Sequence, residues 1–285
     1  MIKIFKYFIQ SLFIFLFFII GRLMGIFLSR KLFSKFFLIL GPLFKSKKIF
    51  IKNLNIYSEK TSKHAVNKIY KDMWKNYGMT FIEYIFLNHF RKNKSHITLE
   101  NEKILLQIID NKKPVIFISG HFANFELMSM EITKKNIPLA TIYRPLNNFF
   151  LNPFMEYLRK KYVCQNQIKK GLFGVKETIG YLKRKHSIAL MIDQRVSEGS
   201  KIDFFNKPAY TTTLPAQLSI KFDIDVIPVY IERIKNDKFK IEFQERISPK
   251  LYTNKMDFTK KLNKILEDMV LRNPNQWIWT HNRWK

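Results

Sequence analysis

Short apolar runs alternate with amphipathic stretches from residue 112 onward, and this alternation constrains the fold more than any other feature. Apolar runs of this length are typical of buried strands, whereas apolar residues at three- and four-residue steps are typical of helices. The predicted strands are 114–119, 139–143, 187–192, 226–233 and 238–245, and the predicted helices are 124–135, 152–162, 172–185, 213–222 and 257–272. The pattern predicts an α/β fold, with a mixed, mostly parallel sheet covered by helices on both faces.

Three polar side chains fall just after predicted strand ends. His121 follows the first strand, Arg144 the second and Asp193 the third. In open α/β sheets, ligands bind at the carboxyl ends of the strands. We therefore expect these three residues to lie near one site.

The N-terminal stretch is apolar on every helical face. Residues 7–20 read YFIQSLFIFLFFII, and the apolar character continues to Leu28 if Arg22 lies at a membrane interface. That length meets the ~20 residues that a spanning helix needs. A membrane anchor is favoured over a cleaved signal peptide, because a cut site with small residues is missing. A buried core helix is the other alternative. The expected division is an anchor helix at 1–30 and a second domain at 31–285.

The charge balance favours anionic partners. The chain has 50 basic and 22 acidic residues, a net charge of +28, which suits nucleic acid, anionic lipid or an acidic protein. Heavy use of Lys, Ile, Asn and Phe is also typical of an AT-rich genome. Zinc-finger spacing, an RNP-like motif and a compact basic helix are all missing, so nucleic acid is not an expected partner. The single cysteine, Cys164, allows no intrachain disulfide, and no metal or cofactor is expected.

His121 and Glu126 form an H-x4-E spacing that suits acyl transfer. An alcohol that attacks a thioester needs a base near neutral pH, and histidine has an ordinary pKa of ~6.5. A carboxylate on the other ring nitrogen fixes the tautomer and stabilises the imidazolium. The pairing requires His121 to lie in the turn before a helix, a turn that Gly120 would supply. A buried core histidine is the alternative that spacing alone leaves open.

Five ordered blocks resemble the late lipid A acyltransferases of Gram-negative bacteria. GHFANFE at 120–126 is similar to the GHFGNWE-type block of that family. The later blocks are YRP at 143–145 with NP at 152–153, DQ at 193–194, FF at 204–205 with PA at 208–209, and PNQW at 274–277 followed by Trp279, His281, Arg283 and Trp284. Three positions depart from the family pattern. Ala123 stands where Gly is frequent, Phe125 where Trp is frequent, and Asn206 where Gly usually follows the Phe pair.

The resemblance implies an acyltransferase domain of the lysophospholipid acyltransferase superfamily at 31–285. It implies His121 as the general base that deprotonates a hydroxyl of a lipid A precursor, and Glu126 as the residue that orients His121. Arg144, Asp193, Gln194 and Asn124 are implied as substrate-binding residues. The implied donor is an acyl carrier protein thioester, and the implied acceptor is an anionic lipid. The implied location is the bacterial inner membrane, with the active site facing the cytoplasm. Transfer to another glycolipid or to a lysophospholipid is the alternative.

Overall fold

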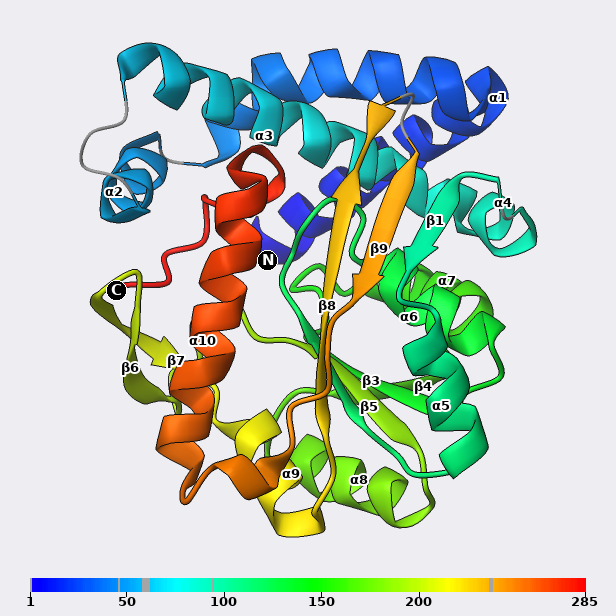
Figure 1. Cartoon of the computed structure of the whole chain (residues 1–285). Coiled ribbons are helices and arrows are strands. Elements are labelled where there is room, and N and C mark those ends of the chain that lie inside the picture. The colour runs from blue at the N-terminus through cyan, green and yellow to red at the C-terminus, as the bar shows by residue number, and fades with distance from the viewer. Residues whose placement is uncertain (1, 46, 58–61, 94, 236–237) are drawn as a thin grey trace.

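A seven-stranded sheet forms the centre of the computed structural model, which describes residues 2–45, 47–57, 62–93, 95–235 and 238–285 (Figure 1). The strand order is β1-β9-β8-β2-β5-β3-β4. These strands are β1 (Ile97–Glu100), β2 (Ile116–Ser119), β3 (Leu139–Tyr143), β4 (Asn166–Lys169), β5 (Ser187–Met191), β8 (Val226–Arg233) and β9 (Phe239–Phe243), and a separate hairpin consists of β6 (Ser200–Phe204) and β7 (Lys207–Thr211).

Helices surround this sheet. They are α1 (Ile2–Phe44), α2 (Lys47–Tyr57), α3 (Lys63–Glu83), α4 (Leu87–Lys92), α5 (Lys103–Asn111), α6 (Glu126–Lys134), α7 (Asn152–Tyr162), α8 (Leu172–Lys183), α9 (Leu214–Phe222) and α10 (Lys255–Arg272). Short 3-10 turns lie at η1 (Tyr84–Phe86), η3 (Pro249–Leu251) and η4 (Pro274–Gln276).

The predicted α/β fold is confirmed. Five of the six strand pairings in the sheet are parallel, and only β8 pairs antiparallel, with β9. The connections through α6 and α7 run along the sheet in one direction, and those through α8 and α9 run in the other. Because such crossovers are right-handed, α6 and α7 belong to one face of the sheet and α8 and α9 to the other. All four residues of the central strand β2 are buried, because helices cover both faces. This burial explains why β2 reads as a continuous apolar run.

The sequence did not predict β1, α5, β4 or the β6–β7 hairpin. β4 lies at the edge of the sheet, and only Ile168 of its four residues is buried, so its sequence NQIK lacks an apolar run. The hairpin turn consists of Phe205 and Asn206, which both have positive φ. A two-residue hairpin turn requires this, and asparagine tolerates it well. Asn206 thus fulfils the role of the expected glycine.

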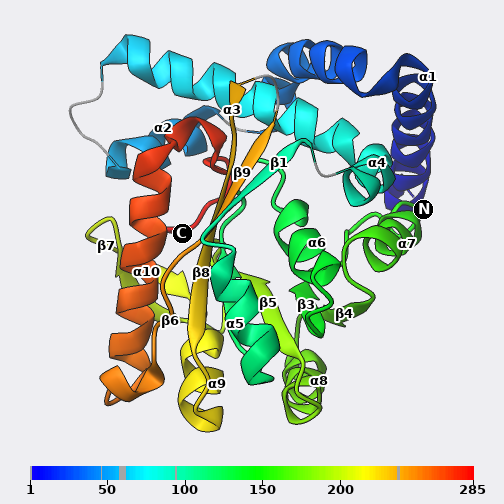
Figure 2. The same ribbon diagram turned by 45° about the vertical axis from the view of Figure 1, so that its right-hand side comes forward.

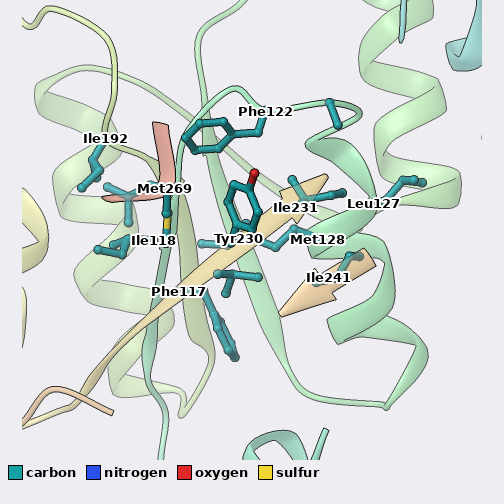
Figure 3. Packing of buried hydrophobic residues seen from close by; sticks show 14 of the residues in the cluster. Phe117, Ile118, Phe122, Leu127, Met128, Ile192, Tyr230, Ile231, Ile241 and Met269 are labelled. Carbon is teal, nitrogen blue, oxygen red and sulfur yellow. The ribbon is translucent and has the colours of Figure 1, made fainter. Parts of the chain in front are cut away.

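The core fixes the backbone next to His121. Phe122 is fully buried, and its ring packs at a centroid distance of 5.4 Å from the Tyr230 ring of β8. Figure 3 shows Phe122 above Tyr230, with Ile118 of β2 and Met269 of α10 close by. Burying a phenylalanine side chain is worth about 1.5–3 kcal/mol, which holds this turn against the sheet.

Helix α1 bends at Gly25, which has φ +75° and ψ 165°. The bend divides α1 into a first arm before Gly25, which stands beside α7, and a second arm after it, which crosses α3 (Figure 2). In the first arm, Phe15 and Phe18 pack on Phe154 of α7 at centroid distances of 5.4 and 5.9 Å. The helix continues to Phe44, so the expected boundary after residue 30 lies inside it.

The outer side of α1 is apolar and exposed. Only 17% of its most apolar 18-residue segment is buried, whereas a core helix would be mostly buried. Phe5, Phe13 and Leu23 are among the exposed side chains. The first arm is roughly 35 Å long at 1.5 Å per residue, which is enough to cross a bilayer hydrocarbon core of about 30 Å. This apolar N-terminal helix suggests membrane association.

A buried ion cluster joins the second arm of α1 to the rest of the fold. Glu83 at the end of α3 is fully buried and accepts hydrogen bonds from Arg30 Nε at 2.6 Å and Arg233 Nη1 at 2.6 Å. Burial by itself would raise the pKa of Glu83, but the charges of Arg233 and Arg30 lower it. The carboxylate therefore stays ionised and connects α1, α3 and β8.

Candidate active site

His121 lies in the turn between the end of β2 and the start of α6, as the sequence predicts. The role expected of Gly120 differs from the observed one. A Cβ at Gly120 would lie 2.7 Å from Phe122 and 3.3 Å from Asp193, so no larger residue fits there. The left-handed backbone belongs instead to Ala123, with φ +42°. Gly120 thus allows close approach, and Ala123 makes the turn.

Asp193 is the carboxylate that contacts His121. β2 and β5 are parallel neighbours, with Ser119 opposite Met191, so the residues two positions further along each strand meet. His121 Nδ1 lies 2.7 Å from Asp193 Oδ1, and the backbone N–H of His121 donates to Asp193 Oδ2 at 2.8 Å. An ionised carboxylate only accepts, so Nδ1 carries a proton, and in the neutral ring Nε2 therefore keeps its lone pair.

Asp193 is held ionised in a buried position. Asp193 is 1% exposed, and the indole Nε1 of Trp277 donates to its Oδ2 at 3.0 Å. Burial alone would raise its pKa, but the charge and hydrogen bonds of His121 and the charge of Arg283 lower it to about 2. His121 and Trp277 thus occupy both carboxylate oxygens of Asp193, and Asp193 is not among the residues that line the cavity next to His121.

The expected pairing of Glu126 with His121 is wrong for this structure. Glu126 Oε1 instead accepts from Arg159 Nη2 at 2.7 Å, Arg159 Nε at 2.8 Å and the Tyr84 hydroxyl at 2.6 Å. The Glu126 side chain leaves the helix at its first residue and faces α7, which carries Arg159. Burial by itself would lower the pKa of Arg159, but the charge of Glu126 raises the pKa of Arg159 above the ordinary value. Glu126 and Arg159 thus form a largely buried ion pair.

The remaining predicted residues divide into two groups. Gln194 Nε2 lies 3.4 Å from His121 Nε2, and Arg144 is exposed beside the same cavity. Asn124 is 1% exposed and donates to Glu83 Oε2 at 2.9 Å, so the expectation that it binds substrate is wrong. Its neighbour Ala123 turns the backbone, which directs Asn124 into the core.

A cavity of about 480 Å³ opens in front of His121. Its basic lining residues are Arg144, Arg159, Lys170 and Arg195, and its apolar ones include Phe125, Met128, Leu190, Met191 and Leu214. Glu126 is the acidic member of the lining, and it is paired with Arg159. A second cavity, of about 460 Å³ at the amino ends of β2 and β8, has basic lining residues such as Lys113 and Arg246 but no histidine. The cavity at His121 therefore combines a base, positive charge and an apolar wall.

Comparison with known proteins decides the family. The chain matches the family described as "Bacterial lipid A biosynthesis acyltransferase" over residues 1–285. It belongs to this family. Among curated proteins, none matches the chain. A solved structure, the 1-acyl-sn-glycerophosphate (LPA) acyltransferase PlsC from Thermotoga maritima, is similar with 13% identity and a TM-score of 0.41, covering 95% of this chain and 99% of that chain.

This lipid A biosynthesis acyltransferase has site residues that the sequence reasoning missed. His281 lines the cavity, and its Nε2 accepts the backbone N–H of Arg195 at 2.9 Å. Burial lowers the pKa of His281 to about 4, so its ring is neutral at pH 7. The C-terminal block that carries Trp277 and His281 was the available signal. The sequence held no comparable signal for Arg159 or Tyr84, because neither residue lies in a motif block at a strand end.

Within the described ranges, no group of three or more His, Cys, Asp or Glu side chains could hold an ion. Cys164 is buried, and burial raises the pKa of its thiol to about 11, which disfavours the thiolate.

Proposed function

We propose that this acyltransferase moves a fatty acyl chain from an acyl carrier protein thioester to a hydroxyl of an anionic lipid A precursor, with His121 as general base. The observation that carries the proposal is the position of the imidazole. Its Nδ1 is held 2.7 Å from buried Asp193, and the ring also lines the cavity. The proposed location is the cytoplasmic face of the inner membrane, where the carrier protein is found.

The reaction follows from the tautomer of His121. Nε2 takes the proton of the acceptor hydroxyl while the oxygen attacks the thioester carbonyl carbon. The tetrahedral oxyanion collapses, the carbon–sulfur bond breaks, and the leaving thiolate takes the proton back from the imidazolium. The products are the lipid ester and the free carrier thiol. Gln194, 3.4 Å from Nε2, is the amide best placed to donate to a reacting oxygen.

Asp193 is the positioning residue in this proposal. Its pKa of about 2 keeps it negative at neutral pH, so it stabilises the imidazolium that forms during transfer. The hydrogen bonds from Trp277 and from the backbone of His121 fix the carboxylate. The C-terminal segment thereby supports the base.

The positive side of the cavity supports an anionic acceptor. Glu126 neutralises Arg159. Burial lowers the pKa of Lys170, the charge of Glu198 raises it and the charge of Arg144 lowers it, so Lys170 and Arg144 are neighbouring like charges. A phosphate or carboxylate between these two cations would relieve the repulsion. We assign Arg144 and Lys170 to the acidic headgroup of the acceptor.

The first test is acyl transfer by the purified full chain in detergent. The substrates are an acyl carrier protein thioester and a tetra-acylated lipid A precursor, with the product measured by mass spectrometry. We expect His121→Ala to lose about 10² or more in rate, as for removal of a general base. His64→Ala, at an exposed histidine of α3, is the matched control and should be unchanged. A His121→Ala variant with wild-type activity contradicts the mechanism.

The acceptor and donor are tested separately. Lysophosphatidate replaces the lipid A precursor in one reaction, and acyl coenzyme A replaces the carrier thioester in another. We expect the lipid A precursor and the carrier thioester to give the higher kcat/KM. Preference for lysophosphatidate or for acyl coenzyme A would contradict the proposed substrate, whatever the His121 result.

A further inference from the structure

Two adjacent apolar side chains stand out from the surface at the start of α8. Leu172 is 92% exposed and Phe173 is 91% exposed, more than any other large apolar side chain in the described part of the chain. We name these two residues the α8 tip. Single exposed apolar residues are ordinary, but a protruding adjacent pair this large marks a contact with another surface.

Lysines surround the α8 tip. Lys169 and Lys170 precede it and Lys176 follows one turn later, and all three are exposed. The acidic groups that face this region are Glu177, next to Lys176, and Glu198, near Lys170. The balance stays positive. Apolar residues flanked by lysines are typical of segments that enter the headgroup region of an anionic bilayer.

The α8 tip adjoins the active-site cavity. The backbone N–H of Lys170 donates to the carbonyl of Tyr143 at 2.9 Å, and Lys170 and Arg144 both line the cavity. Leu146 also lines it. The loop that follows Leu146 carries Phe149 and Phe150, which pack on Tyr7 and Phe8 of the first arm at centroid distances of 6.1 and 5.5 Å. Exposed apolar side chains from two separate parts of the chain, the α8 tip and the loop with Phe149 and Phe150, therefore lie next to the cavity.

We propose that the α8 tip is a second membrane contact, which inserts into the surface of an anionic bilayer beside the cavity. Lys169 and Lys176 meet lipid headgroups, while Leu172 and Phe173 enter the boundary with the acyl chains. Two side chains are too few for a stable protein interface, which buries about 1,000 Å² or more. A bilayer needs no shape complementarity, and its negative surface matches the lysines. The inference goes beyond the acyl chemistry and does not depend on it.

The test measures the surroundings of residue 173 directly. The chain has one cysteine, Cys164, which is buried and a poor nucleophile, so a Phe173→Cys variant of the full chain can be labelled selectively with an environment-sensitive fluorophore. The labelled protein is reconstituted in vesicles of phosphatidylcholine and phosphatidylglycerol. Leu251→Cys is the matched control, because Leu251 is apolar, 74% exposed and next to a lysine, but lies in η3 outside the site.

We expect the fluorophore at 173 to emit at shorter wavelength than the one at 251 and to be quenched by nitroxide-labelled lipid. Emission at 173 that matches the control, without quenching, would overturn the proposal. A shift that depends on protein density and is insensitive to nitroxide lipid would indicate a second copy of the chain, and would also overturn it.

The contribution of the lysines is tested by lipid composition. In vesicles of phosphatidylcholine alone, the spectral shift and the quenching at 173 should become smaller, because the headgroup attraction is lost. An identical signal in neutral and anionic vesicles would contradict the assignment of an anionic surface.

Discussion

At the residue scale, His121 lies at the centre of the site, and two carboxylates, Asp193 and Glu126, were candidates to pair with its ring. Asp193 Oδ1 lies 2.7 Å from Nδ1, while Glu126 is engaged with Arg159 at 2.7 Å. The two acids therefore have separate roles. In the proposed mechanism Asp193 orients the base, whereas Glu126 compensates the buried guanidinium of Arg159, whose charge would otherwise be unpaired.

Substitution separates these roles. Asp193→Asn should lower kcat by about 10² or more, because the imidazolium loses its partner and the tautomer is no longer fixed. Glu126→Gln should mainly lower stability, by about 3 kcal/mol, because it leaves Arg159 without a counter-charge. The measurements are kcat and the thermal unfolding midpoint in detergent. Equal kcat for wild type and Asp193→Asn, with a large loss in Glu126→Gln, would show that Glu126 is the working partner of His121.

The lowered pKa of Asp193 also predicts that the stability of the protein depends on pH. Its pKa falls from 3.8 to about 2 on folding, so its ionisation stabilises the folded state above pH 3.8, and that contribution is lost as the pH falls towards 2. The difference in unfolding free energy between wild type and Asp193→Asn should shrink by roughly 2 kcal/mol from about pH 5 to about pH 2. Denaturant unfolding at several pH values measures it. A difference that is constant with pH would refute the lowered pKa.

At the element scale, the bend of α1 determines how the apolar helix meets the rest of the protein. The second arm crosses α3 and is fixed by the pair of Arg30 with Glu83 at 2.6 Å. The first arm departs at Gly25 and packs beside α7. A straight helix could not make both contacts.

Gly25 and Gly180 form a matched pair for testing the bend. A Cβ at either position would meet no atom within 4 Å, but only Gly25 has a positive φ, +75°. Gly25→Ala should therefore destabilise the protein by about 1–2 kcal/mol through backbone strain alone. Gly180→Ala, inside α8, should stabilise it by up to about 1 kcal/mol. Thermal unfolding in detergent compares them. Similar effects from both substitutions would mean that the bend is not required.

At the scale of the whole molecule, two forces favour a membrane surface. The apolar side of α1 is largely exposed, and the chain has a net charge of +28. These forces respond differently to salt. Screening weakens the attraction of lysines to anionic lipid, whereas burial of apolar side chains does not depend on charge.

Washing of membranes distinguishes the two forces. We expect the full chain to stay in the membrane pellet at about 1 M salt, where the Debye length is only about 3 Å, because α1 retains it. A peripheral protein held by charge serves as the control and should be released. Release of this chain by salt would show that electrostatic attraction alone holds it.

The sequence alone determined the kinds of elements and much of their order. Apolar runs and helical periodicity are local properties, so β3 and β8 were predicted with their observed bounds. The presence of an apolar N-terminal helix and the turn that carries His121 were also predicted, although the helix continues past residue 30 to Phe44. The tertiary structure decided which carboxylate reaches His121. The H-x4-E spacing favoured Glu126, but the pairing of β2 with β5 brings Asp193, 72 residues away, to the imidazole, and Trp277 joins it from the C-terminal segment. Strand order is a non-local property, and no local pattern of residues encodes it.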